Sequence, residues 1–182
     1  MAGVEPLLKS YEQFICLPWQ TGLAGPQKVW MAVYDEADER RPRARLGAFE
    51  NATTGTGHGW RACDLTDLFA RWMAAQEYRE SYFESPEDLD MALEDFFLHV
   101  VGVVREALAA PDADERGVLA ISGLASLFGL MRASRLVDQV TGSIRGRLLV
   151  FFPGEHQGNN FRLLDARDGW NYLAIPITAH EG

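Results

Sequence analysis

The most informative part of this chain is residues 144–177, which read IRGRLLVFFPGEHQGNNFRLLDARDGWNYLAIPI. Within it, residues 148–152 (LLVFF) form an apolar run in which polar and apolar positions do not alternate. A run of this length and kind is typical of a strand that is buried on both faces. Pro153 and Gly154 follow directly. Both are strong turn residues, so the sequence predicts that the strand ends there.

The residues after this strand have the pattern of a hairpin. Residues 158–160 (GNN) predict a loop, and residues 161–164 (FRLL) then resume an extended pattern. Asp168 and Gly169 stand between that run and residues 171–175 (NYLAI). An Asp-Gly pair between two apolar runs is a hairpin signal. We therefore expect the last elements of the chain to be one inner strand and then a C-terminal hairpin at the edge of the sheet.

Three further stretches are expected to be strands, at residues 29–34 (VWMAVY), 60–63 (WRAC) and 118–121 (VLAI). Stretches with helical spacing separate them, the longest of which starts at Pro86. Strands that alternate with helices predict an α/β fold with a mainly parallel sheet and helices on both faces, a three-layer arrangement like that of P-loop and Rossmann proteins. No phosphate loop accompanies it, because the chain contains neither GxxxxGK[ST] nor GxGxxG.

Length and composition exclude several classes of protein. A chain of 182 residues can bury one core, so we expect a single domain over residues 1–182. The N-terminal residues lack the apolar run of a signal peptide, and no segment approaches the ~20 apolar residues of a membrane span, so a soluble cytoplasmic protein without membrane contact is expected. Cys16 and Cys63 are then expected to be free, buried thiols. The net charge of −9 argues against autonomous nucleic-acid binding and suits basic protein partners.

The carboxyl ends of the predicted parallel strands give one candidate crevice, because ligands of open α/β sheets bind at that edge. The candidate crevice residues are Asp35, Asp64, Ser122, Gly123, Arg132 and Arg135. The aspartates could hold a divalent cation and the arginines could meet a phosphate. Acidic residues at strand ends are equally typical of helix caps, and this is the simpler interpretation.

A complete set of catalytic groups is missing from the sequence. Ser122 could pair with His156 or His58 as in a hydrolase, but no GxSxG motif surrounds it. His58 and Cys63 lack the spacing of a zinc site, so neither a metal nor a cofactor is expected. A degenerate nucleotide- or metal-dependent phosphoryl-transfer or hydrolase domain remains the alternative to a non-catalytic protein.

Several segments together resemble a known family. They are LLVFFPGE (148–155) with the Gly-Asn-Asn loop after it, RLLDARDG (162–169), NYLAIPI (171–177), VWMAVYD (29–35) and AISGLASLF (120–128). This set, which covers most of the chain, resembles the BrxB family of BREX-type antiphage defence systems. The resemblance implies a small, non-catalytic cytoplasmic subunit of a defence complex that contains PglZ-type, methyltransferase and ATPase components. The alkaline-phosphatase-like PglZ-type subunit is the expected direct partner.

Loops that follow buried strands carry function more often than the strands do, which gives a set of candidate partner-binding residues. They are Phe152, Glu155, Asn159, Asn160 and Trp170. Turn chemistry explains part of this set equally well, because asparagine tolerates a positive φ and Trp170 could simply cap the core.

Overall fold

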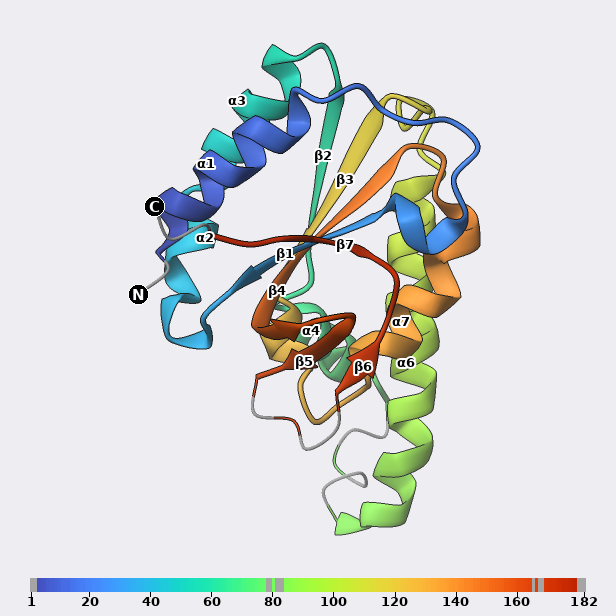
Figure 1. Ribbon diagram of the computed structural model, residues 1–182. Helices are drawn as coiled ribbons and strands as arrows, with labels where there is room; N and C mark the ends of the chain where they lie inside the picture. Colours follow the sequence, from blue (N-terminus) through green and yellow to red (C-terminus); the bar gives the residue numbers. More distant parts are fainter. Residues whose placement is uncertain (1–2, 78–79, 81–83, 165, 167–168, 180–182) are drawn as a thin grey trace.

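The protein, described here from a computed structural model, is a three-layer α/β fold with a mostly parallel sheet between two layers of helices (Figure 1). The structure describes residues 3–77, 80, 84–164, 166 and 169–179. Among these residues, no helix is both long enough and apolar enough to cross a membrane. The predicted fold class is confirmed.

The main path of the seven-stranded sheet runs in the order β2-β3-β4-β1-β7, and all of these neighbours pair in parallel. The strands are β1 (Val29–Tyr34), β2 (Gly59–Asp64), β3 (Gly117–Ser122), β4 (Arg147–Gln157) and β7 (Ile175–Ile177). The stretches at residues 29–34, 60–63, 118–121 and 148–152 were therefore correctly predicted as parallel strands. Their carboxyl ends lie at one edge of the sheet, as the candidate crevice requires.

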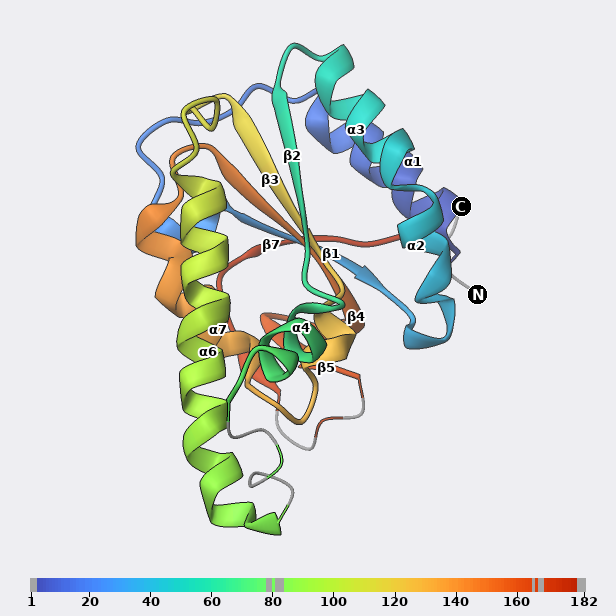
Figure 2. The ribbon, with the colours of Figure 1, turned by 180° about the vertical axis from the view of Figure 1, so that it is seen from behind.

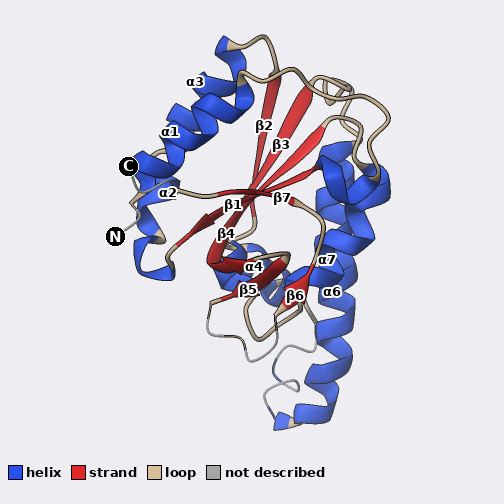
Figure 3. Ribbon diagram, in the orientation of Figure 1, coloured by secondary structure: helices blue, strands red, loops and turns tan. Residues whose placement is uncertain are grey.

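Helices cover both faces of the sheet, as Figure 2 and Figure 3 show from opposite sides. One face carries α1 (Val4–Ile15) and α3 (Leu46–Gly55); the other carries α4 (Leu68–Ala74), α6 (Pro86–Leu108) and α7 (Ala133–Val140). The shorter pieces are α2 (Arg40–Ala44) and the 3₁₀ turns η1 (Gly25–Lys28), η2 (Glu36–Asp38), η3 (Leu124–Leu127) and η4 (Thr141–Ser143). The first half of α6 extends past the carboxyl ends of the strands (Figures 1 and 2).

The burial of β4 on both faces explains its continuous apolar run. Leu149 and Phe151 belong to the apolar cluster under α1 and α3, whereas Leu148, Val150 and Phe152 belong to the cluster under α6 and α7. Successive side chains of a strand point to opposite faces, so a strand between two helical layers needs apolar residues at every position.

The strand does not end at Pro153, as its turn residues predict. Pro153 is still opposite Tyr34 of β1, and Gly154 is opposite Leu163 of β5 (Asn160–Leu163), which pairs antiparallel with the last residues of β4. A Cβ at Gly154 would lie 2.0 Å from the carbonyl oxygen of Arg162, so glycine is needed for the close approach of β5 and not for a turn. The chain reverses instead at Gly158, whose φ is +60°.

The C-terminal hairpin forms, but it lies off the main path of the sheet. β5 pairs antiparallel with β6 (Trp170–Asn171), with Phe161 opposite Trp170. The expected turn residue Gly169 comes directly before β6, while Asp168 lies outside the described residues. The chain then leaves the hairpin and adds β7 in parallel beside β1, so β7, and not the hairpin, is the edge strand on the β1 side of the main path.

A stacked group of side chains ties the segment after α1 to the amino ends of β2 and β4. Trp19 stacks on His58 with ring centroids 3.8 Å apart, and the guanidinium of Arg147 lies 4.7 Å from the centre of the Trp19 ring. Arg147 is buried and donates to the carbonyl oxygens of Gln20 (2.7 Å) and Gly146 (3.0 Å). The cysteines do not contribute a cross-link: both are free, and Cys16 is exposed where a buried thiol was predicted.

This stacking makes stability depend on pH. Burial lowers the pKa of His58, the backbone hydrogen bond to Arg116 opposes this, and the charges of Arg116 and Arg147 lower it further. The unfolded chain therefore binds more protons, so the His58 contribution to stability is complete above the ordinary pKa of about 6.5 and is lost as the pH falls towards the folded-state pKa. We expect the urea midpoint to fall more steeply between about pH 8 and about pH 5.5 in the native sequence than in His58→Gln. Parallel midpoint curves for the two proteins would contradict this role.

Candidate functional site

The carboxyl end of β1 is occupied by a cap. The Asp35 carboxylate accepts a hydrogen bond from the Ala37 backbone N–H at 2.9 Å and begins η2. Next to it, the buried Tyr34 hydroxyl donates to Glu39; burial, followed by this carboxylate, raises the Tyr34 pKa well above its usual range. Asp35 is thus placed as a helix cap, the simpler of the two interpretations of the sequence.

The ends of β2 and β3 bring three of the predicted crevice residues together. The Asp64 carboxylate accepts hydrogen bonds from the Thr66 N–H (2.9 Å) and Thr66 hydroxyl (2.5 Å), and the carbonyl of buried Ser122 accepts from Leu65 N–H (2.9 Å). Gly123 has a φ of +81°, and a Cβ there would lie 2.8 Å from the Asp64 carboxylate. Glycine is therefore required for this tight junction between two strand ends.

Asp64 is also paired with a cation. The guanidinium of Arg43 donates to its carboxylate at 3.0 Å. Partial burial favours the neutral acid, but the hydrogen bonds from Thr66 and the pairing with Arg43 outweigh it and lower the pKa of Asp64. Within the described part of the chain, no group of three or more His, Cys, Asp or Glu side chains could hold a metal ion. The two aspartates of the crevice are thus used in separate local structures.

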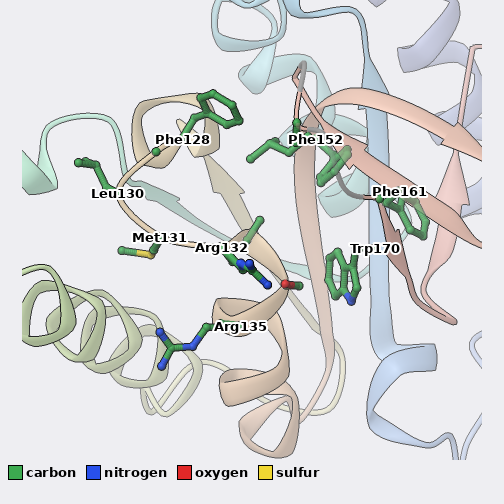
Figure 4. A pocket seen from close by; sticks show the side chains of 14 residues that line it. Phe128, Leu130, Met131, Arg132, Arg135, Phe152, Phe161 and Trp170 are labelled. Atoms are coloured by element: carbon green, nitrogen blue, oxygen red, sulfur yellow. The ribbon is translucent and has the colours of Figure 1, made fainter. Parts of the chain in front are cut away.

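A pocket of about 530 Å³ lies beside this junction, at the carboxyl ends of β3 and β4 (Figure 4). We call it the carboxyl-end pocket. It is lined by Phe128, Gly129, Leu130, Met131, Arg132, Ala133, Ser134, Arg135, Phe152, Phe161, Leu163, Ala166, Gly169 and Trp170. One side is the segment that leads into α7, and the other is the β5–β6 hairpin. Of the predicted residues, it brings together Arg132, Arg135, Phe152 and Trp170.

The two arginines of the pocket, which the sequence does not distinguish, have different roles. Arg135 makes a two-pronged ion pair with Glu94 of α6, with N–O distances of 3.0 and 3.1 Å, and its guanidinium lies 4.1 Å from the centre of the Phe97 ring. Figure 4 shows it pointing away from the pocket. Arg132 is exposed, lies between the Phe128 loop and Trp170, and has no hydrogen-bond or ion-pair partner among the described side chains.

Aromatic rings form the opposite side, which we call the aromatic wall (Phe152, Phe161 and Trp170). The rings of Phe152 and Phe161 meet edge to face at 5.8 Å, and Trp170 stacks on Tyr172 at 4.2 Å. Phe152 is 1% exposed, so the prediction that it contacts a partner is wrong. Its ring is buried behind the surface of the pocket and supports the other rings of the aromatic wall. Trp170 is half-buried and offers a fixed aromatic surface to the pocket.

The other predicted contact residues lie outside the pocket. Glu155 is exposed and pairs with Arg162 on the neighbouring strand. The carbonyl of Asn159 accepts from the Tyr172 N–H at 2.9 Å, and Asn160 begins β5, where its side chain lies against Gly169. Both asparagines are therefore part of the hairpin structure, but neither has the positive φ that the alternative interpretation invoked, because Gly158 supplies it.

Sequence reasoning missed the apolar rim of the pocket. After β3, only Leu124–Leu127 is helical, as the 3₁₀ turn η3. The chain then turns at Gly129, which has a φ of +79°, and leaves Phe128 42% exposed. Gly129 was the signal in the sequence that a helix could not continue, because glycine readily adopts the positive φ that ends a helix.

The described lining of the pocket is mainly aromatic and aliphatic, with two arginines and one serine. Among the described lining residues there is no histidine, cysteine or carboxylate that could act as a base or nucleophile. The nearby thiol of Cys63 has its pKa raised by burial and by Asp64, so it is protonated at neutral pH. Among its described residues, the pocket offers mainly apolar surface, and the guanidinium of Arg132 has no ion-pair partner there.

The comparisons with known proteins return nothing: no protein-family model, no curated protein and no solved structure matches this chain. The resemblance to the BrxB family therefore depends on the sequence segments alone.

Proposed function

We propose that this protein is a non-catalytic adaptor subunit that holds a partner protein at the carboxyl-end pocket. The observation that carries this proposal is the composition of the pocket, in which aromatic and aliphatic side chains surround Arg132 and no histidine, cysteine or carboxylate is found among the described lining residues. Aromatic residues, methionine and arginine are enriched in the buried centres of protein interfaces, and acidic residues and lysine are depleted there. The pocket follows this pattern.

The identity of the partner comes from the family resemblance. The segments that resemble BrxB imply a subunit of a BREX-like antiviral defence complex in the bacterial cytoplasm, in contact with a PglZ-type subunit. A net charge of −9 supports a partner whose surrounding surface is basic. We therefore propose the PglZ-type subunit as the direct contact.

The proposal is tested by titrating the purified PglZ-type subunit of the same defence locus into this protein and measuring heat of binding. Trp170→Ala is expected to weaken the complex about tenfold or more, because large aromatic residues carry a disproportionate share of interface energy. Leu17→Ala is the matched control, since Leu17 is 59% exposed on the segment after α1 and lies outside the pocket. Separate elution of the two native proteins at micromolar concentration, or equal affinity of the two variants, would refute the adaptor function at this pocket.

The same preparation tests the alternative of a nucleotide- or metal-dependent enzyme. Asp35 and Asp64 are a helix cap and an ion-pair partner, so millimolar Mg²⁺ with ATP is expected to leave the melting temperature unchanged. A rise in melting temperature that disappears in the double variant Asp35→Asn, Asp64→Asn would favour the enzyme and count against the adaptor.

A further inference from the structure

In the part of the chain that the structure describes, the carboxyl-end pocket has a positive charge without a counter-charge. The charged residues of its described lining are Arg132 and Arg135, and Arg135 is neutralised by Glu94. Arg132 lies between the Phe128 loop and Trp170 (Figure 4) without a counter-charge from the described residues. Because the chain as a whole is acidic, a guanidinium that has no partner among the described residues and lies beside apolar surface is a local exception, and it favours a negative charge on the ligand.

The size of the pocket limits what can fill it. A volume of about 530 Å³ falls within the ~300–1,000 Å³ of sites that hold a small ligand or a few side chains. A sphere of that volume is about 10 Å across, and an extended chain advances about 3.3 Å per residue, so about three residues cross it. In an extended segment, residues i and i+2 point to the same side. Two side chains in this relation can therefore enter together.

The geometry points to one occupant, and this inference rests on the proposed adaptor function: we propose that the pocket takes an extended segment of the partner in which a large apolar side chain and an Asp or Glu are two residues apart. The apolar side chain packs against Trp170 and the rim at Phe128, and the carboxylate pairs with Arg132. One guanidinium matches the two oxygens and single charge of a carboxylate. A phosphate carries more charge, and the second arginine that would be needed to balance it is already bound to Glu94.

A peptide titration tests this inference without the partner. The probe is a short glycine peptide, acetylated and amidated at its ends, that contains Trp and Glu separated by one glycine, and its binding to the full chain is followed by fluorescence anisotropy of an attached dye. Replacing Glu by Gln in the probe is expected to weaken binding about tenfold, the usual worth of a charge-assisted hydrogen bond. The same loss is expected when the Glu probe meets Arg132→Ala, whereas the Gln probe should bind Arg132→Ala and the native protein equally.

Two further variants sharpen the result. Arg145→Ala is the matched control, because Arg145 is also exposed but lies before β4 and lines no part of this pocket. Arg132→Glu should prefer a probe in which Lys replaces Glu. Tighter binding of a phosphoserine probe than of the Glu probe, a need for a free C-terminal carboxylate, or equal binding of the Glu and Gln probes would each overturn the inference.

Failure of this inference and failure of the adaptor function give different results. If the PglZ-type subunit binds the native protein, loses affinity for Trp170→Ala and binds Arg132→Ala unchanged, the adaptor function stands and the requirement for a carboxylate is wrong. If the Glu probe binds as expected while the PglZ-type subunit does not, the pocket chemistry stands and the partner is wrong.

Discussion

Replacing Phe49 by alanine is expected to lower the free energy of unfolding by about 3–5 kcal/mol, the usual cost of removing a fully buried phenylalanine. Phe49 is 0% exposed and joins three elements, α3, α1 and β4. Its ring on α3 lies 5.2 Å from the ring of Tyr11 on α1 and 5.0 Å from that of Phe151 on β4. The cavity left by alanine would lie between these two rings, which belong to a helix and a strand of the buried core, so it cannot close by a small shift.

A buried hydrogen-bond chain beside this ring adds to the expected loss. The Tyr11 hydroxyl donates to the Thr53 hydroxyl at 2.6 Å, and Thr53 donates to the carbonyl of Phe49 at 2.8 Å. Any rotation of α3 into the cavity would disturb these bonds, whose groups are shielded from water.

Urea unfolding of the native protein, Phe49→Ala and Leu17→Ala measures the effect. Leu17→Ala is the control, with an expected change within about 0.5 kcal/mol because its side chain is largely exposed. Phe49→Leu fills part of the cavity and should fall between native and alanine, which keeps the test informative if the alanine variant does not fold. A loss below about 1 kcal/mol for Phe49→Ala would show that α3 does not pack on the sheet as described.

A strand that is buried on both faces can be predicted from sequence, because it requires a continuous run of apolar residues. Residues 148–152 are apolar at every position since helices cover both sides of β4. The end of that strand could not be predicted. A glycine at position 154 is compatible both with a turn and with the close approach of a second strand. Only the position of the Arg162 carbonyl oxygen in the structure shows that the second explanation is correct.

The sequence placed the candidate site at the carboxyl edge of a parallel sheet, and four of the predicted residues line one pocket there, but their individual contacts could not be predicted. Arg132 and Arg135, however, are distinguished only by Glu94, which is 41 residues away from Arg135 along the chain. The same holds for Asp64, whose partner Arg43 approaches from another element. Such pairings depend on tertiary structure, and the sequence pattern does not contain them.

Gly146→Ala is expected to lower the free energy of unfolding by up to about 3 kcal/mol, at the upper end of the range for overpacked sites. Gly146 comes directly before β4, where the chain passes the start of β3. A Cβ at this position would lie 2.0 Å from the carbonyl oxygen of Gly117 and 2.8 Å from that of Asp114. Both are backbone atoms, so no change of side-chain rotamer can relieve the contact, and β4 would have to move away from β3.

Gly142→Ala is the matched control for this variant. It lies four residues earlier, and a Cβ there would have no neighbour within 4 Å. Loss of backbone freedom in the unfolded chain should make this change neutral or slightly stabilising, by less than about 1 kcal/mol. The comparison by urea unfolding therefore separates a close approach of two strands from any general effect of replacing glycine near β4. Equal stabilities of Gly146→Ala and Gly142→Ala would mean that the amino ends of β3 and β4 are further apart than the structure has them, and that Arg147 is then not held against Gln20 and Trp19.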